Sequence, residues 1–199
     1  MKKLIFAFVI ISIFNSSCFG QTEQLKKLSK QQIIQLSKGV LLVRLKSKQK
    51  TILELRKFGK DNLANKIEQQ QAELNKKIVS AFKNDFDFCS TYFFFSKHSK
   101  SVKDRQFGNV IFLNDNLVPE PIIKFDYKAN FFIAEFVTLE QNDIANMGFE
   151  ALVIRNDQFI QLKRPFPYYA RTFSSLPIKR KIKKAVRRMN KKLYKFLKK

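Results

Sequence analysis

The stretch FDFCSTYFFFS, Phe86 to Ser96, has six aromatic residues among its eleven positions and marks the point where the chain changes character. The residues before it have helical patterns and many lysines. After it, as far as Phe173, short runs of β-branched and aromatic residues alternate with turn residues. The last segment, Pro177 to Lys199, is again helical in pattern and strongly basic. We therefore expect an aromatic, nearly uncharged core that is flanked by basic helices.

Positive charge is concentrated at the two ends of the chain. The 199 residues carry a formal net charge of +23. Residues 21–84 contain fifteen basic and five acidic residues, residues 85–176 contain ten and eleven, and residues 177–199 contain twelve and none. Basic surface attracts phosphate-rich partners, which outside the cytoplasm are anionic lipid headgroups or envelope polymers rather than nucleic acid. The alternative is a solvated face, since Lys, Ile, Phe and Asn, which A/T-rich codons encode, are all abundant.

Residues 1–20 have the pattern of a signal peptide. Two lysines precede the apolar run Leu4 to Phe14, and a short region of small residues ends at Gly20. Cleavage after Gly20 would give an exported product, periplasmic or secreted. The alternative is cleavage before Cys18, which would then be lipidated and would anchor the protein in the envelope. The mature chain has no apolar run long enough for a transmembrane span.

The mature chain, 21–199, has a length that suits one domain. Its first part, 21–84, is expected to be mainly helical, and the part 85–173 mainly strands. Helices are predicted over 21–37, from a Thr51/Glu54 capping box to Gly59, and from a cap at Asp61 to about Asn84. The last two helices should form a hairpin that lays one side on the Phe-rich sheet. The apolar run Val40 to Leu45 is interpreted as a strand, with a buried helical turn as the alternative.

Turn residues separate five strand-like runs in the middle of the chain: Val110–Leu113, Ile122–Tyr127, Phe131–Thr138, Glu150–Arg155 and Phe159–Lys163. The pair Asn156-Asp157 predicts a tight hairpin between Ala151–Arg155 and Gln158–Leu162. Strands that follow one another, with helices at both ends of the chain, predict a single α+β domain rather than βαβ units. We expect a mainly antiparallel sheet of five to six short strands, packed against the N-terminal helical hairpin and completed by a basic amphipathic C-terminal helix.

The segment 177–199 is expected to form a helix with an apolar stripe and a cationic face. The stripe residues are Ile178, Ile182, Val186, Met189, Leu193 and Leu197. A helix of this kind can dock through its stripe or lie on an apolar surface while its cations contact an anionic one. The candidate anion-binding residues are Lys179, Arg180, Lys183, Lys184, Arg187, Arg188, Lys191 and Lys192.

A second candidate site is the aromatic loop 164–171. Its two prolines exclude a central strand, because proline lacks the N–H that a sheet needs. Tyr168 and Tyr169 would stack on a ligand, and Arg164 and Arg171 would pair with an anion. The alternative is a loop that closes one end of the sheet with its rings packed on the core.

Patterns for catalysis and for metal binding are almost absent. His98 is the one histidine, so neither a histidine-based triad nor a multi-histidine zinc site is expected. Cys89, the one cysteine of the mature chain, is expected to be a small buried apolar residue. The sequence thus leans against an enzyme and predicts no metal and no cofactor. We expect an exported, envelope-associated binding or scaffold module that contacts anionic surfaces through its C-terminal helix. The alternatives are an exported enzyme with a site at 164–171 and a subunit that binds another envelope protein.

Overall fold

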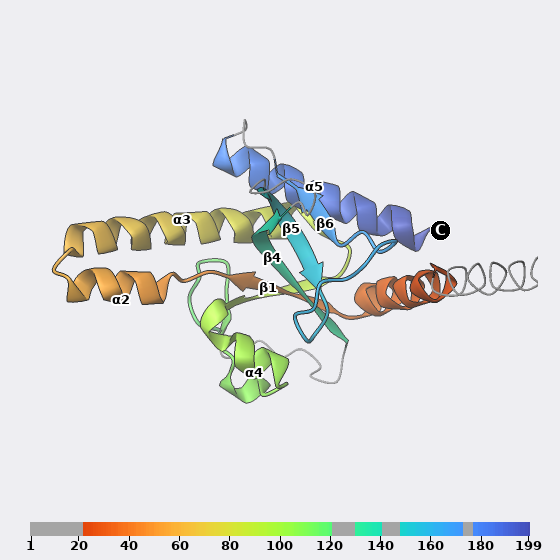
Figure 1. The fold of residues 1–199 in the computed structure, drawn as a ribbon, viewed down its shortest axis with the longest axis horizontal. Coiled ribbons are helices and arrows are strands. Elements are labelled where there is room, and N and C mark those ends of the chain that lie inside the picture. Colours follow the sequence, from red (N-terminus) through yellow and green to blue (C-terminus); the bar gives the residue numbers. More distant parts are fainter. Residues whose placement is uncertain (1–21, 121–129, 141–147, 173–176) are drawn as a thin grey trace, which may run out of the picture.

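Six strands of the described chain form one mixed sheet in the order β3-β2-β1-β4-β5-β6 (Figure 1). The structure is a computed structural model that describes residues 22–120, 130–140, 148–172 and 177–199. The predicted signal peptide 1–20, with Cys18, and the predicted strand Ile122–Tyr127 lie outside these residues. The strands are β1 Val40–Leu45, β2 Ser90–Phe95, β3 Phe112–Leu113, β4 Phe131–Glu140, β5 Gly148–Arg155 and β6 Tyr169–Arg171.

Three of the five strand pairs are antiparallel, so the predicted mainly antiparallel sheet is confirmed in part, but the centre of the sheet is parallel. β1 pairs in parallel with β2 on one side and with β4 on the other, whereas the three outer pairs are antiparallel. The connection from β1 to β2 contains two helices, and parallel neighbours need a long crossover of this kind. The apolar run of β1 was the available signal. Five of its six residues are buried, as is typical of a parallel strand covered on both faces.

The helices lie on both sides of this sheet. The first covers residues 22–38. The others are α2 Gln49–Lys57, α3 Asp61–Asp85, the short α4 Ser99–Lys103 and α5 Ile178–Leu197, with 3₁₀ turns at Ser96–His98 and Phe107–Asn109. α2 and α3 run side by side and extend beyond the sheet (Figure 1). The mixed α and β composition and the terminal helices agree with the prediction.

The hairpin of α2 and α3 packs on the sheet through one end, not along one whole side. The C-terminal half of α3 contributes Ile78 and Phe82 to the core. In α2, all of whose residues are described, Ile52 is the one buried residue. At the far end of the hairpin, Phe58 is 77% exposed. Part of the hairpin side that was predicted to lie on the sheet therefore extends beyond it.

The predicted helix starts are displaced, and the predicted stop is correct. α2 begins at Gln49, after Lys48 in a left-handed conformation with φ 49°, so Thr51 lies inside the helix and does not cap it. Asp61 is the first residue of α3. Its carboxylate makes no capping hydrogen bond, but its negative charge interacts favourably with the positive N-terminal end of the helix dipole. Gly59 has φ 67° and ends the turn between the helices, a conformation that glycine adopts without steric cost.

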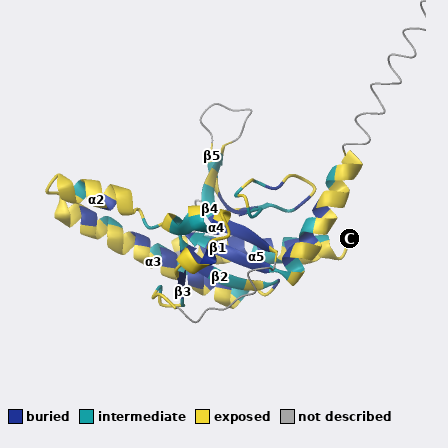
Figure 2. Ribbon diagram, turned by 90° about the horizontal axis from the view of Figure 1, so that it is seen from below, coloured by how far each residue is buried: buried dark blue, intermediate teal, exposed yellow. Residues whose placement is uncertain are grey.

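Alternate residues of the central strands supply two cores, one on each face of the sheet. Figure 2 shows this buried region in dark blue. The larger core joins β1, β2, β4 and β5 to α3, α5 and the first helix, and includes Phe82, Phe93 and Met189. The smaller core lies on the opposite face, where Phe94 and Phe131 meet Val102. The aromatic run of β2 thus serves both cores because successive strand residues point to opposite faces.

The tight two-residue hairpin predicted after β5 is wrong, because residues 158–162 form no strand of the described sheet. Asn156 accepts backbone N–H bonds from Gln158 at 3.1 Å and from Ile160 at 2.8 Å through its side-chain oxygen. The chain reverses here through a longer turn, closed by a bond from the N–H of Asn156 to the carbonyl of Ile160 at 3.0 Å and by an isolated antiparallel bridge between Arg155 and Gln161. β5 pairs with β6 instead. The side chain of Asn156 thus stabilises a longer turn than the two-residue connection predicted from the sequence.

Candidate functional site

The apolar stripe of α5 is docked on the sheet, which is the first of the two arrangements predicted for this helix. Ile182, Val186, Met189 and Leu193 are at most 2% exposed and belong to the larger core. Ile178 and Leu197, at the two ends of the helix, are partly exposed. The buried stripe fixes which face of α5 points outward. The same stripe is not available for contact with another protein while the helix stays docked.

The outward face of α5 carries most of the predicted anion-binding residues. Arg180, Lys183, Lys184, Arg187 and Lys191 are exposed, and Arg188 and Lys192 are half-buried. Lys179 lies in the helix, and its side chain is outside the described residues.

Acidic residues of neighbouring elements neutralise part of the positive charge of α5. Arg187 pairs with Asp85, at the end of α3, with Nε 2.6 Å from Oδ1. Lys183 Nζ lies 4.0 Å from the same oxygen. Lys181 pairs with Glu150 of β5. The cationic face is thus held in place by ion pairs at its N-terminal and middle turns.

The predicted loop 164–171 is in large part structural. Its last residues form the edge strand β6, which is compatible with the prolines that precede it. Phe166 is buried in the larger core. Arg171 stacks on Phe149, with its guanidinium carbon 4.6 Å from the ring centroid. These contacts favour the predicted alternative, in which the loop closes one end of the sheet.

Tyr169 brings the two predicted sites into contact. Its ring lies 5.0 Å from that of Tyr168, and its carbonyl oxygen accepts a 2.9 Å hydrogen bond from Lys192 of α5. The Lys192 ammonium also lies 5.0 Å from the Tyr169 ring centroid. Burial lowers the pKa of Lys192, and the nearby Arg188 and Arg164 act in the same direction. Lys192 is therefore engaged by Tyr169 and does not point freely into solvent.

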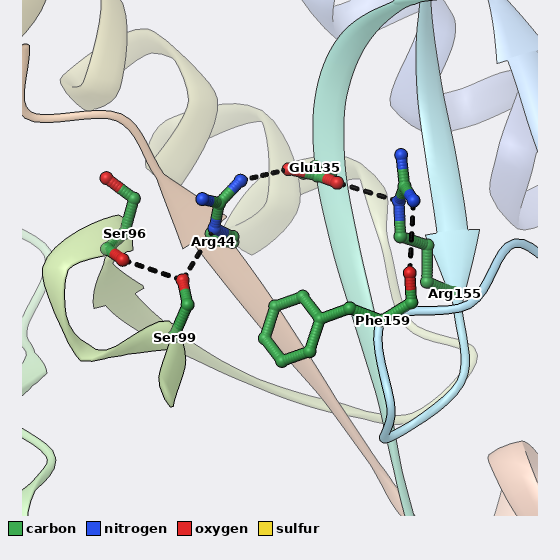
Figure 3. A network of polar contacts seen from close by, with 6 residues as sticks. All are labelled: Arg44, Ser96, Ser99, Glu135, Arg155 and Phe159. Atoms are coloured by element: carbon green, nitrogen blue, oxygen red, sulfur yellow. Dashed lines mark hydrogen bonds and ion pairs between the residues drawn. The ribbon is translucent and has the colours of Figure 1, made fainter. Parts of the chain in front are cut away.

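A buried ion network that was not predicted crosses the sheet on the face of the smaller core. Glu135 of β4 lies between two arginines: Arg44 of β1, with Nη1 2.6 Å from Oε2, and Arg155 of β5, with Nε 2.7 Å from Oε1 (Figure 3). Arg44 Nε also donates to Ser99 at 2.8 Å, and Arg155 Nη1 donates to the carbonyl of Phe159 at 3.0 Å. Two guanidiniums share one carboxylate, so the network carries a net positive charge.

The structure also contains a small cavity that was not predicted from the sequence. It has a volume of about 110 Å³ and lies between α3, α5 and the ends of β1 and β4. Its lining includes the buried amides Gln71 and Asn75, together with Arg44, Lys46 and Lys181. Only the strand topology places these residues together, because they come from distant parts of the chain. The single sequence signal was an arginine in an otherwise apolar strand, at Arg44.

Cys89 and His98 are the one cysteine and the one histidine among the described residues. Burial raises the pKa of the Cys89 thiol to about 12, so the thiol is protonated at neutral pH and is a weak nucleophile. His98 is half-buried. Burial and Lys97 lower its pKa, and its Nε2 has no hydrogen-bond partner in the described part of the chain. Neither residue lies in a group of potential metal ligands among the described residues.

Comparison with known proteins gives no relative from which to transfer a function: no family model, curated protein or solved structure matches the chain. Among the described residues, no helix combines the length and the apolarity that crossing a bilayer requires.

Proposed function

We propose that the protein is an exported, non-catalytic module that binds the anionic lipid headgroups of the cell envelope through the cationic face of α5. The observation that carries this proposal is the docked stripe of the helix. Because Ile182, Val186 and Met189 are buried, the exposed cations of α5, which include Arg180, Lys183, Lys184, Arg187 and Lys191, lie together on the outward face. Lysines and arginines close to an anionic membrane each contribute about 1 kcal/mol to binding, and this contribution falls with salt.

The composition of α5 supports the same proposal. Its segment 177–199 has twelve basic residues and no acidic one, whereas the strands of the middle part are nearly neutral. Codon bias would distribute lysine throughout the chain and would not remove acids from one helix. Arg180 and Lys191 have no ion-pair partner within the described residues, so they remain available to headgroups.

Binding to vesicles tests the proposal. The purified protein is sedimented with phosphatidylcholine vesicles that contain, or lack, phosphatidylglycerol, at several salt concentrations. The variant has four cations of α5 replaced by glutamine: Arg180, Lys183, Lys184 and Lys191. At about 1 kcal/mol for each charge, its partition coefficient should fall by about a thousandfold at low salt.

The matched control removes the same charge from the other basic element. It has four exposed lysines of the α2–α3 hairpin replaced by glutamine: Lys50, Lys57, Lys60 and Lys66. We expect a much smaller loss than in the α5 variant. Equal losses in the two variants would show that net charge, and not α5, determines binding, and the proposal would be wrong. It would also be wrong if the unchanged protein did not bind phosphatidylglycerol.

Lipidation at Cys18 is the alternative route to the envelope, and it can be separated from charge. A lipid anchor would keep the protein on membranes in high salt, whereas binding through α5 would not survive it. Fractionation of cells that express the unchanged protein or Cys18→Ser distinguishes the two. If Cys18→Ser alone releases the protein at low salt, the anchor and not α5 holds it there.

A further inference from the structure

The helix 22–38 projects beyond the core at its N-terminal end. Its buried residues, at most 2% exposed, all lie in the second half of the helix or at its middle: Ser29, Ile33 and Leu36. None of residues 23–28 is buried, and Leu28 is 48% exposed. Figure 2 shows this end of the helix largely in yellow, outside the buried region. These turns therefore contribute little to the core and present their side chains outward.

The C-terminal end of α5 lies beside this helix. Lys30 Nζ is 3.5 Å from the backbone oxygen of Lys199, and Figure 1 shows the end of α5 next to the helix 22–38. Leu197, in the last turn of α5, is 38% exposed, and Tyr194 is 37% exposed. Helices from opposite ends of the sequence thus form one end of the molecule.

This end of the molecule is strongly basic. We call residues 23–28 and 194–199 together the terminal surface. It contains five lysines and one acidic residue, Glu23. Four of the lysines are exposed and have no ion-pair partner among the described residues: Lys26, Lys27, Lys195 and Lys198. Because Lys195 and Lys198 follow Lys191 at spacings of four and three residues, they continue the outward cationic face of α5 to its end.

The tip of the α2–α3 hairpin is another projecting part of the described chain, and it lacks this surplus of charge. Phe58 at the tip is 77% exposed. Residues 54–62 contain three basic and two acidic residues, and Arg56 is paired with Glu68. Attachment to an anionic membrane surface combines apolar contact with cationic charge. The tip offers the first of these without the second, whereas the terminal surface offers both.

We propose that the terminal surface enters the headgroup region of an anionic bilayer. Leu28 and Leu197 lie at the boundary with the acyl chains, and the lysines of this surface bind the lipid phosphates. In such interfacial elements, apolar contact and charge both contribute to binding. The inference rests on the lipid binding proposed for α5. It adds the helix 22–38 as a second contact and places the C-terminal end of α5 nearest the bilayer.

A single introduced tryptophan reports which part of the protein enters the bilayer, because the chain has no tryptophan of its own. Leu28→Trp and Leu197→Trp are compared with Phe58→Trp, a control at a more exposed apolar position. With vesicles that contain phosphatidylglycerol, the emission of the first two variants should shift to the blue and should be quenched by brominated lipid. Phe58→Trp should show neither effect.

Sedimentation of the same samples separates this inference from the function proposed for α5. The inference is overturned if the vesicles sediment the protein but the tryptophan of either Leu28→Trp or Leu197→Trp is not quenched. Equally strong quenching of Phe58→Trp would also overturn it. In both cases the function proposed for α5 stands. If the unchanged protein does not sediment with phosphatidylglycerol vesicles, both proposals are wrong.

A pair of charge variants tests the helix 22–38 by itself. Lys26→Gln with Lys27→Gln removes two charges from the terminal surface, and Lys57→Gln with Lys60→Gln removes two from the hairpin tip. At low salt the first pair should lower the partition coefficient by about thirtyfold, and the second by less than about threefold. Equal losses would show attraction by net charge alone and would overturn the inference.

Discussion

Replacing Glu135 with methionine should destabilise the protein by about 3 kcal/mol. The carboxylate is 6% exposed and holds two guanidiniums, Arg44 and Arg155, that are 27% and 26% exposed. Removing one partner from a buried ion pair typically costs about 3–5 kcal/mol because a buried charge is left uncompensated. Here two positive charges are left facing each other. Water reaches about a quarter of each arginine, which places the expected loss at the lower end of that range.

Urea unfolding monitored by circular dichroism measures this loss, and the chain offers a matched control. Arg56 and Glu68 form an ion pair at 2.7 Å, the same separation as in the buried network, but their side chains are 43% and 55% exposed. Glu68→Met should therefore cost less than about 1 kcal/mol. A loss of about 3 kcal/mol for Glu135→Met would lower the Tm by about 6–12 °C. Equal losses at the two sites, or a loss below about 1 kcal/mol for Glu135→Met, would refute the assignment of a buried network.

A second variant separates the cost of unpaired charge from the contribution of the network itself. In the triple replacement Arg44→Met, Glu135→Leu and Arg155→Met, no unpaired charge is left behind. A buried ion network replaced by apolar residues of similar volume is often neutral or stabilising. The triple variant should thus recover most of the stability that Glu135→Met loses. If it is less stable than the single variant, then packing rather than charge explains the loss.

Three further predictions follow from particular contacts. Phe82→Ala should cost about 3–5 kcal/mol in urea unfolding because the side chain is fully buried, whereas Phe58→Ala, at 77% exposure, should change stability by less than about 0.5 kcal/mol. Gly39→Ala should destabilise by several kcal/mol in thermal unfolding, since a Cβ there would overlap the carbonyl oxygen of Asn130, and normal stability would show that the chain can shift. Above pH 9, stability should fall by at most about 1.4 kcal/mol per pH unit because the Cys89 thiol ionises in the unfolded chain but not, until about pH 12, in the folded one; Cys89→Ala should remove this part of the slope in pH-dependent unfolding.

The elements that sequence predicts correctly are those whose packing depends on one local period. The stripe of α5 repeats at helical spacing, and its central residues are buried as expected. β4 and β5 are rich in β-branched and aromatic residues and occupy almost the predicted ranges. Gly59 ends a helix because its φ of 67° suits glycine, and this preference is local too. For such elements, neighbours in the chain already determine which side is buried.

Strand order and register could not be predicted because they depend on partners that are distant in sequence. β1 lies between β2 and β4, both of which follow it in the chain by many residues. The turn at Asn156 has the composition of a tight hairpin, yet the side chain of Asn156 bonds a longer loop, and the next residues make one isolated bridge instead of a strand. β6 forms from residues after two prolines, where an edge position tolerates what a central one would not.

The polar interior could not be predicted for the same reason. Gln71 and Asn75 lie four residues apart on a long helix, a spacing that places them on one face without showing what that face meets. Glu135 occurs in a strand whose flanking residues are apolar, and its partners come from β1 and β5. A carboxylate or an amide is placed in such positions only if distant segments supply donors and acceptors, because burial without them costs several kcal/mol. The polar residues that break an apolar pattern are thus the ones whose surroundings are fixed by topology: Glu135 meets its arginines on one face of the sheet, and Gln71 and Asn75 meet the end of β1 on the other.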